Sequence, residues 1–318
     1  MPRTKIGIVG TGAIGSVMAY YFTCDVANHQ IASTDPTSKI LTFVRSKTKT
    51  ATFNTITSVN AENYPLAHQH DVFSLHSLCA VDLLIVPVKC YQVAALIAEI
   101  KDLISPTTVI FLLQNGMGGI EAIQEQLPEQ PLLVGTTTDA AYQSDVAHYQ
   151  QTAIGKLDFG WVNLKTLTSS QQALIEKLIL ANHPQPILHT DIRSALFHKL
   201  AINALINPLC TIKDVNNGGL LDERHDLHIL FMEVWQAYEH LNKRSGTKKL
   251  SKASLFTSIE QVILNTFNNS CSMREDIKHQ RKTEVDGILG YILRNKGQLK
   301  LPFIESLYRQ IRQLESIH

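Results

Sequence analysis

The stretch Ile6-Gly7-Ile8-Val9-Gly10-Thr11-Gly12-Ala13-Ile14-Gly15 decides the fold of the N-terminal half of this chain. Its beginning predicts a buried strand, and the apolar residues that follow it predict a helix. Gly10 permits a tight turn, Gly12 lets the backbone approach a pyrophosphate, and Gly15 lets the helix pack closely on the strand. The free N–H groups and the positive end of the helix dipole then face the phosphates. We therefore predict a dinucleotide site formed by Gly10, Thr11, Gly12, Ala13, Ile14 and Gly15.

The residue that ends the second strand decides which dinucleotide is bound. Asp35 lies 20 residues after Gly15, the spacing of an acidic residue that binds the ribose hydroxyls of NAD. However, residues 32–37 have turn chemistry. Residues 40–44 are the better strand and are followed by Arg45, whose guanidinium can bind a 2′-phosphate with two hydrogen bonds. We therefore predict NADP, and NAD held by Asp35 is the alternative.

The first half of the chain alternates short apolar runs with helical patterns. Helical spacing of apolar residues covers 92–104, 119–126 and 169–180. This alternation predicts an α/β fold, a Rossmann-type doubly wound parallel sheet. The expected strands are 5–9, 40–45, 82–88, 108–113 and 132–135, with 153–155 and 157–162 as possible additions.

The second half of the chain has only long helical periodicities. We place the boundary at residue 189, after the Pro184-Gln185-Pro186 turn, so the predicted domains are 1–189 and 190–318. The first would bind the cofactor and the second, all-helical domain would bind the substrate. The expected helices are 191–207, 222–245, 251–270, 272–296 and 302–316.

Composition favours an ordinary globular enzyme. Of 318 residues, 44% are hydrophobic and 18% charged, which excludes a disordered or coiled-coil chain. A formal net charge of +1 gives no reason to expect nucleic acid or an anionic membrane as a partner. The chain is expected to be a monomer or a homodimer that acts on a small molecule.

The cysteines and the N-terminus indicate a cytoplasmic protein. The five cysteines are odd in number and include no Cys-x-x-Cys pair, so we expect reduced thiols and no metal site. The N-terminus runs straight into the first strand and has no export-signal pattern. The densest apolar stretch, residues 78–88, is interrupted by Asp82 and Pro87 and is too short to span a bilayer.

Two polar residues follow predicted strands, where ligands gather in open α/β sheets. Lys89 follows the strand that ends at Val88, and Asn115 follows the strand that ends near Leu113. Asn115 also precedes Gly116-Met117-Gly118-Gly119, which allows close approach of the backbone to a ligand. Each residue could simply finish a strand at the surface, but we predict that both contact ligand.

Two rows of polar residues recur at a spacing of four in the helical half. Lys199, Asn203 and Asn207 form one row on a helix otherwise built of Leu, Ile and Ala, which favours a wet cleft over a solvent face. The other row, taken alone, suits a solvated helix face and consists of Ser272, Asp276, Gln280 and Glu284.

Taken together, these residues resemble the 2-dehydropantoate 2-reductase family, also called ketopantoate reductases. The anchors occur in family order and cover almost the whole chain. They are the Gly10–Gly15 loop, Pro87-Val88-Lys89, Gln114-Asn115-Gly116-Met117-Gly118, Gly135-Thr136-Thr137-Thr138, the Lys199 to Pro208 helix, Ser272-Met273-Arg274-Glu275-Asp276, and Thr283-Glu284-Val285-Asp286 to Gly290.

The resemblance implies reduction of ketopantoate to pantoate by NADPH, a step toward pantothenate and coenzyme A, in a cleft between two domains. It makes Lys199 the general acid and Glu284 a catalytic residue that binds substrate or orients Lys199. It makes Arg45 the 2′-phosphate contact and Lys89 a nicotinamide-side contact. Asn115 would contact both cofactor and substrate, and the other substrate residues would be Asn203, Asn207 and Ser272.

The chain departs from the family pattern before Arg45, where about a dozen extra residues, within 25–39, put the alignment of the second strand in doubt. Two other functions remain open. One is a two-domain dehydrogenase for another 2-oxo acid or an imine. The other is a regulator that senses NADP without turnover, which would have no need for Lys199, Asn203, Asn207 and Glu284.

Overall fold

The computed structural model describes residues 4–10, 12–25, 30–31, 38–44, 55–65, 69–72, 78–146, 148–248 and 250–317. The chain forms two compact units. An α/β unit comprises Met1–Gln114 and Gly119–Ile192, and a helical unit comprises Asn115–Gly118 and Arg193–His318. The sequence places the boundary at residue 189, and the structure divides at Ile192.

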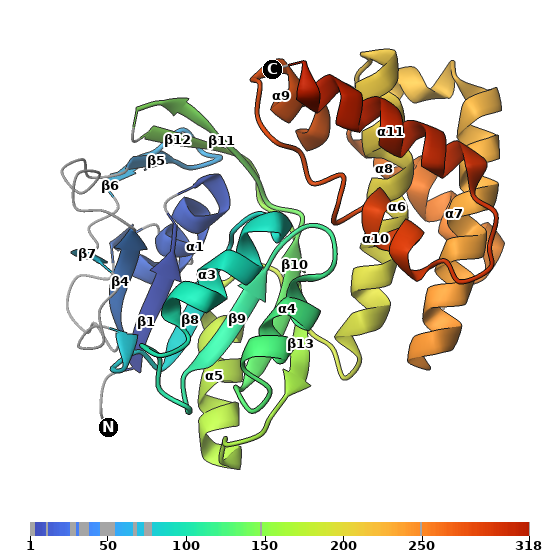
Figure 1. Cartoon of the computed structure of the whole chain (residues 1–318). Coiled ribbons are helices and arrows are strands. Elements are labelled where there is room, and N and C mark those ends of the chain that lie inside the picture. Colours follow the sequence, from blue (N-terminus) through green and yellow to red (C-terminus); the bar gives the residue numbers. More distant parts are fainter. Residues whose placement is uncertain are drawn as a thin grey trace. The chain divides into compact units, whose positions relative to one another are not determined.

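The α/β unit is built on one large, mostly parallel sheet (Figure 1). From β10 to β7 its neighbours pair in parallel, in the strand order of a doubly wound dinucleotide-binding fold, so the predicted fold class is confirmed. Antiparallel β13 extends the sheet beyond β10. In sheet order the strands are β14 (Pro186–Leu188), β13 (Leu157–Asn163), β10 (Leu132–Thr137), β9 (Val109–Leu113), β8 (Leu83–Val86), β1 (Thr4–Val9), β4 (Ser38–Val44) and β7 (Gln69–Val72).

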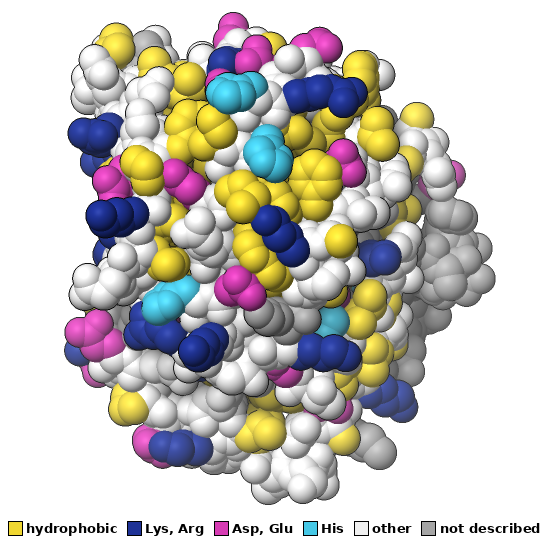
Figure 2. All heavy atoms as spheres, turned by 90° about the vertical axis from the view of Figure 1, so that its right-hand side faces the viewer, with side chains coloured by type: hydrophobic (Ala, Val, Ile, Leu, Met, Phe, Trp, Pro, Cys, Tyr) yellow, Lys and Arg dark blue, Asp and Glu magenta, His cyan; other side chains and the backbone are white. Residues whose placement is uncertain are grey.

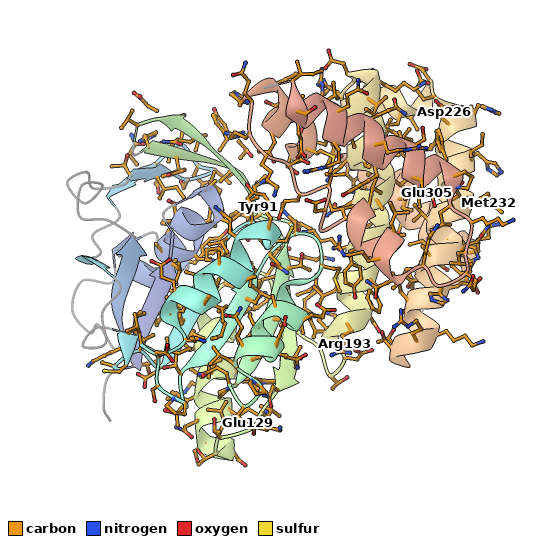
Figure 3. The ribbon with its side chains drawn as sticks, viewed as in Figure 1. Tyr91, Glu129, Arg193, Asp226, Met232 and Glu305 are labelled. Atoms are coloured by element: carbon orange, nitrogen blue, oxygen red, sulfur yellow. The ribbon has the colours of Figure 1, made fainter. Side chains whose placement is uncertain are left out.

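Helices cover both faces of this sheet. In Figure 1, α3 (Val93–Ile100) and α4 (Gly119–Gln126) lie in front of it and α1 (Ala13–Thr23) lies behind it. A short 3-10 helix, η2 (Cys90–Gln92), precedes α3, and Figure 3 labels its Tyr91. Tyr21 of α1 and Ile175 and Ile179 of α5 (Ser169–Asn182) belong to one core with Phe111 and Phe159 of the sheet. The helices thus bury the strands on both sides, as the alternating sequence pattern predicts.

The sequence does not predict a second, smaller sheet that packs on α1. Its strand order is β11 (Ala140–Asp145), β12 (His148–Ala153), β5 (Thr55–Thr57) and β6 (Asn63–Pro65). The expected strand at 153–155 is wrong, because β12 ends at Ala153 and Gly155 packs tightly against the backbone of Thr138 and Asp139. A two-stranded pair, β2 (Cys24–Asp25) and β3 (Gln30–Ile31), begins one residue before the segment of extra residues and continues into it.

A buried polar network joins the small sheet to α1 and α5. The carboxylate of Asp139 accepts hydrogen bonds from the Tyr21 hydroxyl (2.9 Å) and the Gly155 N–H (2.8 Å), and it pairs with the His183 ring (2.9 Å). The side chains of Asp139 and His183 are both 0% exposed. Burial alone raises the pKa of Asp139, but the bonds from His183, Thr137 and Gly155 outweigh it and hold that pKa below 3.8. Burial beside the same carboxylate raises the pKa of Tyr21.

The helical unit packs long helices around its own apolar core. Pro208 lies inside α6, where its missing N–H interrupts the hydrogen-bond ladder without ending the helix. Buried Leu200, Leu230 and Ile304 show that α6, α7 and α11 all turn apolar faces inward. The elements are α6 (Ile192–Lys213), the 3-10 helix η3 (Asn217–Leu221), α7 (Arg224–Ser245), α8 (Lys252–Asn265), α9 (Ser272–Lys278), α10 (Leu289–Asn295) and α11 (Pro302–Ser316).

The predicted single helix at 272–296 is wrong. α9 ends at Lys278, Gln280 has a positive φ of 55°, and a helix resumes only at Leu289. The polar row at spacing four therefore does not continue along one helix. Asp276 is buried and pairs with Arg281 (3.2 Å), and Gln280 is exposed.

The surface agrees with the balanced charge of the sequence. Figure 2 shows Lys and Arg interspersed with Asp and Glu on the face in view, with apolar side chains gathered mainly in its upper central part. Within the described part of the chain, α6 alone is long and apolar enough to cross a membrane, and 67% of its most apolar window is buried in the structure. That burial is typical of the core helix of a folded unit.

We predict that Asp139→Asn lowers the free energy of unfolding by about 3 kcal/mol, because it disrupts a buried carboxylate that is hydrogen-bonded to Tyr21, Gly155 and His183. The low pKa of Asp139 stabilises the folded state above pH 3.8, and this contribution is lost as the pH falls below that value. The variant should therefore lose stability less steeply in acid. Urea unfolding from pH 7 down to about pH 2 measures both effects. Asp145→Asn, at an exposed site of β11, is the control and should change neither.

Candidate functional site

The glycine loop has the geometry that a pyrophosphate requires. Gly10 has a positive φ of 92°, which favours glycine. A Cβ on Gly15 would lie 2.4 Å from the carbonyl oxygen of Gly10, so only glycine lets α1 start this close to β1. A Cβ on Gly12 would meet nothing within 4 Å, which leaves open space beside its backbone. These residues fit a bound dinucleotide at the N-terminus of α1; Thr11 lies outside the described residues.

Lys89 follows the strand next to this loop. β8 pairs in parallel with β1, so both strands end at the same edge of the sheet. Val88 lies 3.8 Å from where a Cβ of Gly10 would be, and Pro87 lies 3.4 Å from that of Gly15. Lys89 itself is half-buried, and its N–H donates to Oε1 of Gln92 (3.1 Å). The α/β unit therefore brings together two of the predicted cofactor elements.

The two candidates for reading the ribose, Arg45 and Asp35, both lie outside the described residues. β4 ends at Val44 and runs parallel to β1, with Phe43 opposite Val9. The strand that precedes Arg45 thus ends at the same sheet edge as the glycine loop. In this fold, that edge is where the adenosine ribose is held.

On α6 the predicted row of polar residues lies among core side chains. Lys199 and Asn203 are half-buried, while neighbouring Leu200 and Ala204 are buried. Asn207, one turn beyond Asn203, is 8% exposed. One uninterrupted helix carries all three residues, so the spacing of four places them along one face.

A cysteine that the sequence analysis passed over connects Asn207 to Ser272. The Cys271 thiol donates to the carbonyl oxygen of Asn207 (3.6 Å) and accepts from the N–H of Arg274 (3.5 Å), so it caps α9. Ser272, the first residue of α9, is exposed and is held one residue from this contact. The thiol of Cys271, together with burial, raises the pKa of Cys210. Both cysteines are free thiols, as the sequence predicts.

The segment Asn115–Gly118 and the turn that carries Glu284 are hydrogen-bonded to each other. The N–H of Met117 donates to the carbonyl oxygen of Gly287 (2.8 Å). Gly116 has a positive φ of 77°, and a Cβ there would lie 3.1 Å from the Gly287 backbone. By its contacts this segment belongs to the helical unit, although it follows β9 directly. Glu284 is 5% exposed, and its carbonyl oxygen accepts from the N–H of Gly287 (3.0 Å).

The structure thus groups the predicted residues in three places. The glycine loop and Lys89 lie together in the α/β unit, Asn207 lies near Ser272, and the Asn115 segment is bonded to the turn of Glu284. The sequence did not predict a role for Gly287, whose carbonyl oxygen holds the N–H of Met117. Its place in a glycine-containing family motif was the only signal for it. Among the described residues, no group of three or more His, Cys, Asp or Glu could hold a metal ion.

Comparison with known proteins decides the family. The family model "Ketopantoate reductase PanE/ApbA" matches residues 6–163, and the model of its C-terminal part matches residues 191–315. This chain belongs to the ketopantoate reductase family. The two matched ranges reach into both units and include every described candidate residue.

Individual relatives agree with this assignment. The 2-dehydropantoate 2-reductase of Vibrio cholerae is 30% identical over 98% of this chain and 98% of its own length. That of Shigella flexneri is 33% identical over 75% of this chain and 76% of its own length. The crystal structure of a probable 2-dehydropantoate 2-reductase from Bacillus subtilis has a TM-score of 0.79 at 24% identity, and covers 98% of this chain and 99% of its own.

The family makes this chain an oxidoreductase that uses a nicotinamide cofactor. A ternary structure of D-mandelate dehydrogenase with NADH and anilino(oxo)acetate has a TM-score of 0.82. It covers 99% of both chains at 20% identity, so its likeness to this chain shows the fold alone. Recognition of the family from sequence motifs is confirmed.

We predict that Gly15→Ala and Gly12→Ala differ sharply in stability. The added methyl group at residue 15 would collide with the Gly10 carbonyl, and we expect a loss of about 2 kcal/mol. At residue 12 the space is open, so the unfolding midpoint should stay near that of the wild type. Urea unfolding of the two variants measures this, and equal midpoints would contradict the geometry described for the loop.

Proposed function

We propose that this chain reduces 2-dehydropantoate to pantoate with NADPH, a step toward pantothenate and coenzyme A. The observation that carries the proposal is the row of Lys199, Asn203 and Asn207 on α6, in a chain that matches a curated 2-dehydropantoate 2-reductase over 98% of both lengths. An NADP sensor without turnover would have no need for such a row.

The cofactor would be held by the α/β unit. When bound, a nicotinamide dinucleotide supplies a hydride to the ketone carbon. Gly10, Gly12 and Gly15 leave room for its pyrophosphate, and the N-terminus of α1 faces the phosphates. Lys89 is assigned to the nicotinamide side and Arg45 to the 2′-phosphate, which makes NADP the preferred cofactor.

Lys199 is assigned as the general acid. An ammonium can stabilise the oxygen that gains negative charge and can give it a proton, which completes the hydroxyl group. Asn203 and Asn207 can hydrogen-bond the substrate carboxylate and hydroxyls without adding charge. Ser272 and Asn115 are assigned to the same substrate. Glu284, which is buried, either accepts from a substrate hydroxyl or orients Lys199.

A second candidate is reduction of another 2-oxo acid or an imine. The D-mandelate dehydrogenase structure, which shares this fold, contains an oxo-acid ligand of that kind. We also propose a cytoplasmic location and a monomer or homodimer. A ketopantoate reductase from Staphylococcus aureus, which has a TM-score of 0.75 with this chain, is described as dimeric.

We predict that the purified protein oxidises NADPH when ketopantoate is added and that Lys199→Ala lowers kcat about 100-fold or more, because the general acid is lost. Binding of NADPH, measured by fluorescence titration, should be unchanged. Lys213→Gln is the control, because Lys213 lies on the same helix but pairs with Glu223 and Asp226 at the surface. Figure 3 labels Asp226.

Two outcomes would contradict this proposal in different ways. Rapid turnover of another oxo acid with none of ketopantoate would overturn the substrate. Unchanged kcat in Lys199→Ala, with active wild type, would overturn the role of Lys199 and leave the substrate in place.

We predict that Arg45→Ala weakens NADPH binding by about 10-fold or more and leaves NADH binding nearly unchanged, because only NADPH has the 2′-phosphate. Titration of wild type, Arg45→Ala and Asp35→Ala with both cofactors measures this. A selective loss of NADH binding in Asp35→Ala, with no change in Arg45→Ala, would show that Asp35 reads the ribose.

A further inference from the structure

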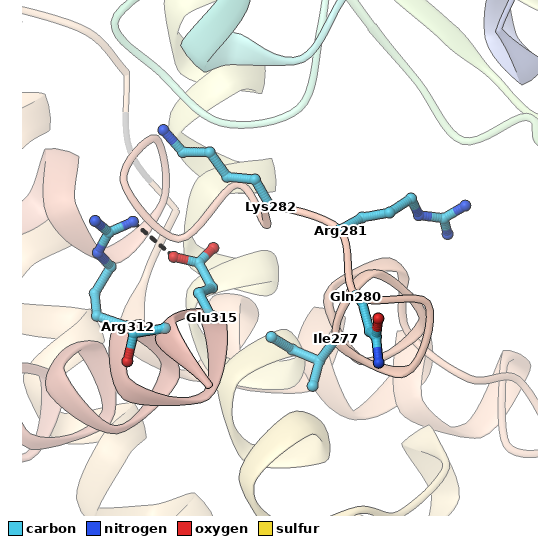
Figure 4. Close-up of a pocket in the computed structure, with 7 residues that line it drawn as sticks. Ile277, Gln280, Arg281, Lys282, Arg312 and Glu315 are labelled. Atoms are coloured by element: carbon cyan, nitrogen blue, oxygen red, sulfur yellow. Dashed lines mark hydrogen bonds and ion pairs between the residues drawn. The ribbon is translucent and has the colours of Figure 1, made fainter. Parts of the chain in front are cut away.

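The turn that carries Glu284 is held by a carboxylate on the last helix. Glu315 of α11 accepts through Oε1 from both the N–H and the hydroxyl of Thr283, each at 2.7 Å. Its Oε2 accepts from Arg312 at 2.6 Å, a contact that Figure 4 marks. The side chain of Glu315 is 8% exposed and Thr283 is 0% exposed, so the two bonds to Thr283 are largely shielded from water, whereas Arg312 is exposed.

Further hydrogen bonds along the turn lead from Thr283 to the segment of Asn115. The Thr283 hydroxyl accepts from the N–H of Val285 (3.1 Å). The Glu284 carbonyl oxygen accepts from the N–H of Gly287, whose own carbonyl oxygen accepts from the N–H of Met117. Glu315 thus stands at one end of a series that contains both Glu284 and the segment that begins at Asn115.

We propose that Glu315 is a positioning residue for the substrate site, because it fixes the turn from Thr283 to Gly287 and thereby orients Glu284 and the Asn115 segment. This inference rests on the proposed role of Glu284 in binding substrate or orienting Lys199. The turn has no regular helix or strand to fix its backbone, since α9 ends at Lys278 and α10 begins at Leu289. The turn has its own bond from the Gly287 N–H to the Glu284 carbonyl oxygen, but the N–H of Thr283 has its partner in Glu315, on another element.

A second bond between α11 and the same turn, at Asp286, remains when Glu315 is changed. The hydroxyl of Tyr308, also on α11, donates to Asp286 (2.6 Å), and this bond raises the pKa of Tyr308. The apolar face of the helix, with Ile304, Leu307 and Ile311, is buried as well. Variants of Glu315 should therefore fold, and their effect should be confined to the turn.

A ligand site in the cavity next to Glu315 accounts for the role of this carboxylate less well than the anchoring of the turn does. The volume of this cavity is about 290 Å³, and its lining includes Arg281, Lys282 and Arg312. Arg281 pairs with Asp276, and Arg312 with Glu315, so much of this positive charge is compensated within the protein. In Figure 4, Arg281 points away from Arg312 and Glu315, so the cations do not converge on one point.

The test compares Glu315→Ala, Glu315→Gln and Glu305→Gln in the full chain. Glu305 lies on the same helix, is labelled in Figure 3 and pairs with Lys296 at a more exposed site, so its variant is the matched control. Amide hydrogen exchange of residues 283–288 reports on the turn. Steady-state kinetics with ketopantoate and NADPH report on the site.

In Glu315→Ala we expect exchange in 283–288 to speed up and the KM for ketopantoate to rise about 10-fold or more, with a smaller change in kcat. The KM for NADPH should stay unchanged. Glu315→Gln should recover much of both effects, because its amide oxygen can still accept from Thr283. Glu305→Gln should match the wild type.

Unchanged exchange in Glu315→Ala would overturn the anchoring role. Faster exchange with an unchanged KM for ketopantoate would show that the anchor is only structural, and an equal KM rise in Glu305→Gln would assign the effect to α11 as a whole. If the wild type does not reduce ketopantoate, the proposed function fails, and with it the role of Glu284 in the site. The exchange experiment would still decide whether Glu315 holds the turn.

Discussion

The close approach of Gly15 to the carbonyl oxygen of Gly10 is the contact on which the α/β unit depends. Because no side chain separates them, α1 can start directly at the end of β1 and pack its apolar side chains on the sheet. The same approach leaves the backbone at Gly12 open. One steric constraint therefore fixes the helix and the space for a cofactor at once.

The sequence predicted those parts of the fold that a local pattern determines. Strands β1, β8, β9 and β10 are mostly apolar runs that are buried along nearly their whole length, and the helices around them have apolar residues at regular spacing. The small sheet escaped prediction because β5 and β6 are three residues each, and β5, which pairs with β6, also pairs with β12, about 90 positions away. Neither their length nor their partners can be inferred from a window of sequence. The Asp139 network that secures this sheet is likewise formed by residues distant in the chain.

In the candidate site, too, some residues were predictable from local spacing and others were not. On α6 the spacing of Lys199, Asn203 and Asn207 translates directly into one face, because the helix is continuous. From Ser272 to Glu284 the same spacing was misleading, since α9 stops after seven residues. Glu284 is a candidate site residue because of the family motif, since the spacing of four wrongly placed it on the same helix as Ser272. That motif did not show that its turn is hydrogen-bonded to Met117 and lies close to Gly116, because that contact is made by backbone atoms and leaves little trace in side-chain chemistry.

This contrast suggests why part of the site lies outside regular structure. A helix fixes its side chains at set intervals, so α6 can present an ammonium and two amides only in a row. A turn can place a carboxylate at a position that no helix register offers, but its backbone groups then need partners elsewhere. Here the N–H of Thr283 donates to Glu315, and the carbonyl oxygen of Gly287 accepts from the N–H of Met117. The freedom gained in placing Glu284 thus requires buried hydrogen bonds from two other parts of the chain.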